Sequence, residues 1–210
     1  MNHTIKTILE HRSIRKFTDQ SIDQSTLEAI LKAACNGSTM GNMQLYSIIV
    51  TQDKERMKDM APFHFNQPIA TNAPLILTFC ADFNRFNQYC SFRDADTTAY
   101  NNLQSYHWAV IDAIIAAQNA CVAAESLGLG ICWLGTITYN ADKFIQSFNL
   151  PKALSLLLVS QWDILLKNLI LPINCLWMLW FITNLIRIIQ KRESISYLKK
   201  KRTIQLPKIY

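Results

Sequence analysis

The sequence lacks the short motifs that mark most hydrolytic, metal-dependent and phosphoryl-transfer enzymes. It contains no G-x-S-x-G, no H-E-x-x-H and no P-loop, so nucleophilic hydrolysis, zinc proteolysis and nucleotide phosphoryl transfer have no support. His64 and His107 do not have the spacing of metal ligands, and we interpret them as structural or surface residues. We therefore predict no metal site and name no catalytic residue. Any chemistry must come from a bound cofactor.

Paired cysteines are absent as well. The six cysteines form no C-x-x-C and no zinc-site spacing with histidine. This pattern is typical of reduced, mostly buried thiols in a cytosolic protein. The N-terminus leads straight into a helical pattern without a basic and apolar leader, which predicts no signal peptide and a cytoplasmic location.

Acidic residues and glycine are scarce towards the C-terminus. Residues 1–151 contain 11 Lys and Arg against 13 Asp and Glu, a net charge of −2. Residues 152–210 contain 10 against 2, a net charge of +8, and all five glycines precede residue 136. This change predicts one domain with a sizeable core over residues 1–152 and an apolar, basic tail over residues 153–210.

Hydrophobic periodicity predicts alternating helices and strands in the first part. The predicted helices begin after Thr4 as a cap, at Asp23 or Ser25, and at Asp53, with two more over 106–127 and 140–148. The predicted strands cover 44–51, 74–82 and the glycine-flanked segment 128–136. The strand over 74–82 is almost continuously apolar, which is typical of a strand buried on both faces. Gly128 is expected to end the longest helix.

Two polar stretches are candidate binding segments. His11–Phe17 sets an imidazole, a hydroxyl and two guanidiniums close together, and guanidinium forks suit phosphate oxygens and the edge of a planar heterocycle. The alternative is a solvated helix end. Residues 36–42 form a small polar run that lets a backbone approach a ligand closely, or an ordinary loop. Gly130 and Gly135 could admit a flat ring, although this spacing alone is weak.

Five motifs over residues 1 to about 151 resemble, in order and at similar spacing, the oxygen-insensitive NADPH nitroreductase and flavin reductase group of the nitroreductase family. They are His11–Phe17, Ser47–Ile49, Cys80–Arg85, Gln118–Ala120 and Ala124–Gly130. The resemblance implies an α+β homodimer with a mixed or antiparallel central sheet flanked by helices and FMN at the dimer interface. In this chain, the normal last strand and C-terminal arm of that fold are expected to be missing.

The resemblance also implies a site and an activity. His11, Arg12, Ser13 and Arg15 would hold the FMN phosphate and ring edge, Thr39 and Gln67 match polar positions around the cofactor, and the backbone of Trp133, Leu134, Gly135 and Thr136 would line the isoalloxazine. NADPH or NADH would pass a hydride to the flavin, and a small-molecule acceptor (a nitroaromatic, a quinone or a free flavin) would take the electrons.

Residues 153–210 depart from the family pattern. There the family has a strand, a segment resembling V-G-Y-P-A-E-x-P, and then Lys and Arg that help bind the flavin phosphate. With suitable synonymous codons for 161–172, a shifted frame reads V-G-Y-P-A-E-K-P-D-L-T, so we interpret this region as a frameshifted translation.

One alternative takes the tail at face value: the 17-residue apolar stretch 173–189, followed by basic residues, could be a membrane anchor on a tethered reductase. A separate alternative is that the chain is a degenerate, non-catalytic remnant of the family. The run Lys199–Arg202 has no interleaved aromatic residues, and we predict no nucleic-acid partner.

Overall fold

The computed structural model describes residues 1–151, 154–155, 161–163 and 165–166. The predictions for Cys175, for an anchor at 173–189 and for the basic run lie outside these residues. The helices are α1 (His3–Leu9), α2 (Gln24–Cys35), α3 (Lys54–Met60), α4 (Ile69–Asn72), α5 (Asn84–Ser91), α6 (Leu103–Ser126) and α7 (Ala141–Ser147). The 3₁₀ turns are η1 (Met40–Asn42), η2 (Ala61–His64), η3 (Thr98–Tyr100) and η4 (Gly135–Tyr139). The strands are β1 (Tyr46–Thr51), β2 (Ile76–Asp82), β3 (Leu129–Gly130), β4 (Trp133–Leu134), β5 (Leu154–Ser155), β6 (Gln161–Asp163) and β7 (Leu165–Leu166).

The central sheet is built on an antiparallel pair. Strands β1 and β2 pair from Tyr46↔Ala81 to Thr51↔Ile76, and the sheet continues in the order β1-β2-β6-β4. The other side of β2 pairs with β6 at one end and with β5 at the other, while β3 and β7 form a separate pair. This arrangement confirms the α+β fold with an antiparallel sheet. Where the last strand was expected to be missing, short strands of two or three residues pair instead.

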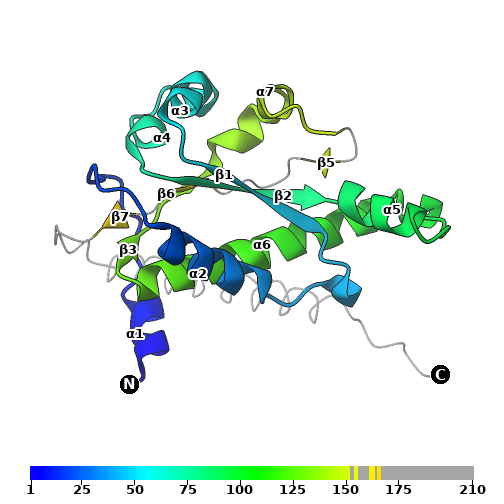
Figure 1. Ribbon diagram of the computed structural model, residues 1–210, viewed down its shortest axis with the longest axis horizontal. Coiled ribbons are helices and arrows are strands. Elements are labelled where there is room, and N and C mark those ends of the chain that lie inside the picture. Colours follow the sequence, from blue (N-terminus) through cyan, green and yellow to red (C-terminus); the bar gives the residue numbers. More distant parts are fainter. Residues whose placement is uncertain (152–153, 156–160, 164, 167–210) are drawn as a thin grey trace, which may run out of the picture. The chain divides into compact units, whose positions relative to one another are not determined.

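Strand β2 is the centre of the core, and all seven of its residues are buried. Alternate side chains of a strand point to opposite faces, so Leu77 and Phe79 join the cluster formed with α2 and α6, whereas Cys80 joins the cluster around Phe144 of α7. Helices α2 and α6 accordingly cover one face of the sheet, and α3, α4 and α7 cover the other (Figure 1). The near-continuous apolar pattern therefore correctly predicted a strand buried on both faces.

Helix α6 packs closely because its buried side is lined with small residues. Its buried alanines are Ala109, Ala113, Ala116, Ala117, Ala120 and Ala124. The helix ends before Gly128, whose φ of 82° is the left-handed conformation that glycine adopts without strain. The helix begins three residues earlier than predicted. It was expected to be buried on nearly all sides, but one face carries the exposed residues Leu103, Ile111 and Ile114. Among the described residues, α6 has the length and composition of a membrane span, but half of its apolar window is buried, as in a core helix.

The start of α6 is fixed by a side-chain cap. Asn102 Oδ1 accepts a hydrogen bond from the backbone N–H of Ser105 at 2.9 Å, and Asn102 Nδ2 donates to the carbonyl oxygen of Ala99 at 2.7 Å. We expect Asn102→Ala to lower the free energy of unfolding by about 1 kcal/mol. Urea unfolding followed by circular dichroism would measure this loss. The matched control is Asn101→Ala, because Asn101 is the exposed neighbour without a side-chain hydrogen bond to a described residue; equal effects of the two variants would contradict the capping role.

Two of the three predicted helix N-caps are confirmed. Asp23 caps α2 and Asp53 caps α3, each by accepting a hydrogen bond from a backbone N–H three residues later. The predicted cap Thr4 is wrong: Asn2 caps α1, through a hydrogen bond from the N–H of Ile5 at 3.0 Å. The predicted strand over 128–136 is divided into β3 and β4 and continues into η4.

Candidate functional site

The segment His11–Phe17 follows α1 and runs beside the β3–β4 connection. Ser13 forms an isolated parallel bridge with Ile131, and the Ile14 N–H donates to the Ile131 carbonyl oxygen at 2.8 Å. Ile131 is completely buried, so this backbone pairing attaches the segment to the core. This pairing brings the first predicted site residues, His11–Arg15, close to the last ones, Trp133–Thr136, because Ile131 lies two residues before Trp133.

His11 is held by the last turn of α6. Its Nδ1 lies 2.7 Å from Glu125 Oε1, and the side chains are 45% and 12% exposed, respectively. The partly buried carboxylate fixes the ring while the other nitrogen, Nε2, has no hydrogen-bond partner among the described residues. His11 is therefore oriented by the helix and still has a ring nitrogen to offer a ligand.

Arg12 and Arg15 are both exposed, and within the described ranges neither forms an ion pair with a carboxylate. An Arg side chain stays charged at any physiological pH and presents several N–H donors in a fixed plane. Two such groups on one short extended segment, beside a hydroxyl at Ser13, form a donor set that suits a phosphate or another oxyanion.

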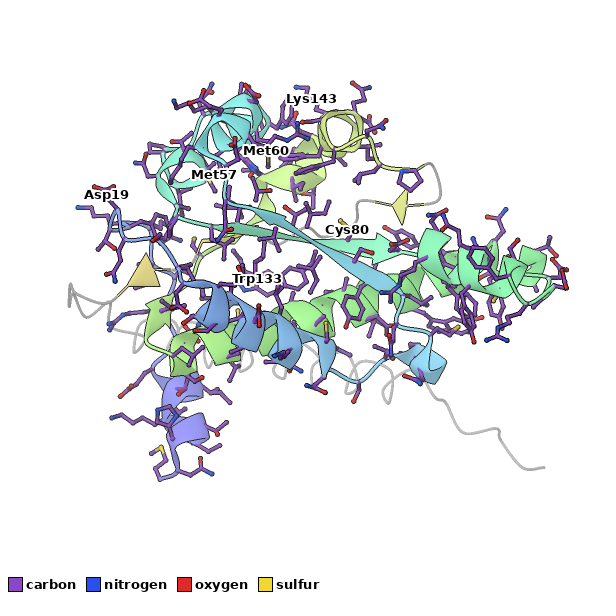
Figure 2. The ribbon with its side chains drawn as sticks, viewed as in Figure 1. Asp19, Met57, Met60, Cys80, Trp133 and Lys143 are labelled. Carbon is purple, nitrogen blue, oxygen red and sulfur yellow. The ribbon has the colours of Figure 1, made fainter. Side chains whose placement is uncertain are left out.

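The turn that follows β4 presents backbone to open space. A Cβ atom built on Gly135 would meet no atom of the described residues within 4 Å, so this stretch can accept a flat group against the main chain. On the inner side, Trp133 Nε1 donates to Cys121 Sγ at 3.2 Å, and the ring packs on the core cluster shared by α2, α6 and β2. Figure 2 shows Trp133 between α6 and the sheet, with Met57 and Met60 on the side of α3. The turn is therefore anchored by its first residue and open at Gly135.

A third segment joins this turn through His64 at the end of η2. His64 Nδ1 lies 2.7 Å from Thr136 Oγ1, and the His64 carbonyl oxygen accepts the N–H of Gln67 at 3.1 Å. Leu134 packs with Ile69 and Cys132 of the same cluster, against which Phe17 also packs. The segments 11–17, 61–70 and 129–136 thus converge, and they carry nine of the ten predicted site residues.

Thr39, the tenth residue, lies on a different part of the fold. Its loop is fastened to α6 by Asp112, whose Oδ1 accepts the Met40 N–H at 2.8 Å and whose Oδ2 accepts the Leu45 N–H at 3.1 Å. Along the helix, Asp112 and Glu125 are about 20 Å apart at 1.5 Å per residue. No hydrogen bond or core cluster among the described residues connects Thr39 with the other nine.

Three residues that hold the predicted segments in place were not predicted to do so: His64, Asp112 and Glu125. Burial lowers the pKa of His64 to about 4, so its ring is neutral at pH 7. Burial also raises the pKa of Asp112, against the two N–H donors that lower it. A carboxylate within the apolar pattern of α6 is the one sequence signal that could have indicated Asp112, because buried charges require partners. His64 was interpreted as a structural or surface residue, and it is completely buried.

The thiols near the site are not activated. Burial raises the pKa of Cys80 to about 12, with a smaller contribution from Asp82, and burial raises the pKa of Cys121 as well. Cys35 is the exposed cysteine among the five that the structure describes. In the same part of the chain, no group of three or more His, Cys, Asp or Glu side chains could hold a metal ion.

Comparison with protein families decides which group this fold represents. The model of the nitroreductase family matches residues 8–160. The chain belongs to the nitroreductase family. Its site residues lie where three segments of a nitroreductase fold converge, which agrees with the family resemblance of the N-terminal motifs.

Individual nitroreductase relatives agree with this placement. The chain is 38% identical over 152 residues to the FMN reductase (NADPH) of Bacillus subtilis and 37% identical over 152 residues to the oxygen-insensitive NADPH nitroreductase of Salmonella typhimurium. Each comparison covers 72% of this chain and 61% of the relative, so the chain spans about three fifths of the length of these curated relatives. The structure of NfrA1 nitroreductase from B. subtilis matches with a TM-score of 0.74 at 35% identity, covering 80% of this chain and 70% of that one.

Proposed function

We propose that the protein is an FMN-dependent NAD(P)H oxidoreductase that reduces nitroaromatics, quinones or flavins by two-electron hydride transfer. The observation that supports this most is the convergence of the segments 11–17, 61–70 and 129–136 in a nitroreductase fold. Relatives named as an FMN reductase (NADPH) and an NADPH nitroreductase support the same activity. We propose a cytoplasmic location, and no role for nucleic acid.

The donor set of the site fits FMN. Arg12 and Arg15 are guanidiniums without carboxylate partners in the described residues, as a phosphate group requires. Ser13 adds a hydroxyl beside them, and the open main chain at Gly135 leaves room for a planar ring. The redox chemistry would be that of bound FMN, which accepts a hydride from NAD(P)H and reduces the acceptor.

In that activity the protein's own residues bind and orient. Arg12, Ser13 and Arg15 would hold the phosphate and the ring edge, with His11 fixed by Glu125 beside them. Gln67 and the backbone of Trp133–Thr136 would line the ring. No side chain is required as a general acid, which is consistent with the neutral thiols and the neutral His64 at this end of the fold.

We also propose a homodimer in which Thr39 serves the site of a second copy. Within one chain, the anchor of the Thr39 loop on α6 is about 20 Å from the anchor of His11, too far for one flavin ring to contact both. Exposed apolar residues on α1 (Ile8, Leu9) and α6 (Ile111, Ile114) offer a surface that a second copy could cover. Light scattering after size-exclusion chromatography would give the mass; a monomer at all concentrations would contradict this proposal.

For residues 153–210 we retain the proposal of a frameshifted tail. The comparisons with curated relatives cover about 152 residues, and the family model ends its match at residue 160. Without the family's later Lys and Arg, FMN would bind more weakly, and complete loss would make the chain a remnant. Sequencing the coding DNA around codon 153 tests the frameshift, and an intact frame together with no in-frame relative matching the shifted frame would contradict it.

The decisive experiment is a visible absorbance spectrum of the full-length protein after addition of FMN and removal of the excess. Stoichiometric flavin bands are expected, followed by NADPH oxidation in the presence of a nitroaromatic. Arg15→Ala should then weaken FMN binding by about ten- to a hundredfold, because a hydrogen bond to a charged group contributes about 1.5–3 kcal/mol. Fluorescence quenching of FMN measures this change.

Lys16→Ala is the matched control, since it removes an exposed cation one residue away. If both variants lose affinity equally, the effect is one of general charge rather than of the Arg15 fork. A wild-type protein that stays colourless contradicts the flavoenzyme and supports the remnant.

A further inference from the structure

His64 is a completely buried histidine next to the proposed flavin site. Its ring packs against Phe144 with centroids 4.8 Å apart, and its Nδ1 lies 2.7 Å from Thr136 Oγ1. Its other nitrogen, Nε2, is buried without a hydrogen-bond partner in the described part of the chain. A neutral ring in this place can donate through one nitrogen only, so the choice of tautomer decides what Thr136 can do.

The two tautomers leave different groups unpaired. If Nε2 carried the proton, a buried N–H would have no acceptor, and the Thr136 hydroxyl would have to donate its hydrogen to Nδ1. If Nδ1 carries the proton, it donates to Thr136 Oγ1 and leaves an unpaired acceptor at Nε2. Unpaired buried N–H groups are rarer than unpaired acceptors, and we assign the proton to Nδ1 on this ground. The hydroxyl hydrogen of Thr136 is then free to point away from His64.

We propose that His64 is a positioning residue that holds Thr136 Oγ1 as an acceptor, so that the Thr136 hydroxyl donates its hydrogen to the edge of the flavin ring. This inference rests on the proposed function. Thr136 is half-buried and follows Gly135, where the main chain meets open space. The backbone carbonyl of His64 also accepts the N–H of Gln67, within the segment 61–70. The imidazole links this segment to 129–136 through Thr136, and both segments would contact the ring.

The same two parts of the chain are joined by a second hydrogen bond, which provides a control. Asn140 Nδ2 donates to the Phe63 carbonyl oxygen at 2.7 Å, so it ties the end of η4 to η2 without touching Thr136. A purely structural role for His64 predicts that loss of either bond has the same effect on flavin binding. The positioning role predicts that loss of the His64 bond alone changes it.

The test compares His64→Leu, which fills most of the space without a donor, with His64→Asn, whose amide can donate near the place of Nδ1. FMN affinity is measured by fluorescence quenching and the bound flavin by its absorbance maximum, and Thr136→Val and the double variant complete the cycle. We expect about tenfold weaker FMN binding for His64→Leu and for Thr136→Val, because one hydrogen bond contributes up to about 1.5 kcal/mol. The double variant should be no weaker than either single variant, and His64→Asn should recover most of the lost affinity. Asn140→Ala should lower the urea midpoint and leave FMN affinity within about twofold.

Several outcomes would overturn the inference. They are additive losses in the double variant, an Asn variant as weak as the Leu variant, or equal effects of Asn140→Ala and His64→Leu on FMN affinity. If His64→Leu does not fold, the comparison of Thr136→Val with His64→Asn decides, since wild-type affinity in Thr136→Val would show that the hydroxyl makes no bond to the flavin. Wild-type protein without bound FMN overturns the proposed function and this inference together, whereas tight FMN binding with unchanged affinity in His64→Leu overturns this inference alone.

Discussion

Asp112→Ala is expected to lower the free energy of unfolding by roughly 3 kcal/mol. Asp112 is fully buried and accepts the backbone N–H groups of Met40 and Leu45, so its removal leaves two donors without partners. Each orphaned buried donor costs about 1–3 kcal/mol. The loop between them is already unusual, with φ values of 55° at Gly41, 56° at Asn42 and 53° at Gln44. Nothing else among the described hydrogen bonds fixes the loop to α6.

Urea unfolding of the full chain measures this loss, with two companion variants. Asp112→Asn keeps one acceptor oxygen and should lose less than Asp112→Ala. Gln118→Ala changes an exposed position of the same helix and should stay within about 0.5 kcal/mol of the wild type. An unfolding midpoint of Asp112→Ala equal to that of Gln118→Ala would show that the loop does not depend on this carboxylate.

The second large effect is a loss of stability in mild acid. Burial lowers the pKa of His64 from an ordinary 6.5 to about 4, so between these values the unfolded chain binds a proton that the folded protein does not. The contribution of His64 is therefore complete above its unfolded pKa and is lost as the pH falls towards 4. Across the whole pH range between the two pKa values, the free energy of unfolding should fall by about 3 kcal/mol, at 1.36 kcal/mol per pKa unit. Stability should rise with pH through this window.

Urea unfolding at neutral pH and near pH 4.5 measures the slope, and His64→Asn should flatten it. Asp112 acts in the opposite direction: its raised pKa lets the folded protein bind a proton first, which favours folding as the pH falls. Hydrogen bonds from Thr98 lower the pKa of Asp96, and the stability that it adds is lost only below the ordinary Asp value of 3.8. The contributions of Asp112 and Asp96 are the same in the wild type and in His64→Asn, so they cancel when the two pH slopes are compared. An identical pH slope in the wild type and in His64→Asn would contradict the assignment to His64.

The sequence predicted those parts of the fold whose signals are local. The caps Asp23 and Asp53, the buried strand β2 and the end of α6 at Gly128 each depend on residues within a few positions of one another. Helix α5 was not predicted, because its sequence NRFNQYCS is mostly polar and its apolar residues Phe86, Tyr89 and Cys90 span little more than one turn. The division between β3 and β4 could not be predicted, since it follows the pairing of Ile131 with Ser13, more than a hundred residues away.

The candidate site was predicted as a set of residues, but its arrangement was not. The motif resemblance assigned His11, Arg15, Gln67 and Thr136 to one cofactor, and the fold brings their segments together. It gave no role to His64 or to Glu125, although Glu125 lies in the motif Ala124–Gly130; these two residues contact Thr136 and His11 from η2 and α6. The resemblance also gave no reason to separate Thr39 from the other nine site residues. That separation follows from the distance along α6 between Asp112, which holds the Thr39 loop, and Glu125, which holds His11.

Helix α6 has a consequence for the proposed dimer. One helix holds the Thr39 loop at Asp112 and His11 at Glu125, so it would take part in two flavin sites at once: that of its own chain and that of the second copy. Each flavin site of the dimer would therefore be bordered by the α6 helices of both chains, by the Glu125 end of one and by the Asp112 end of the other.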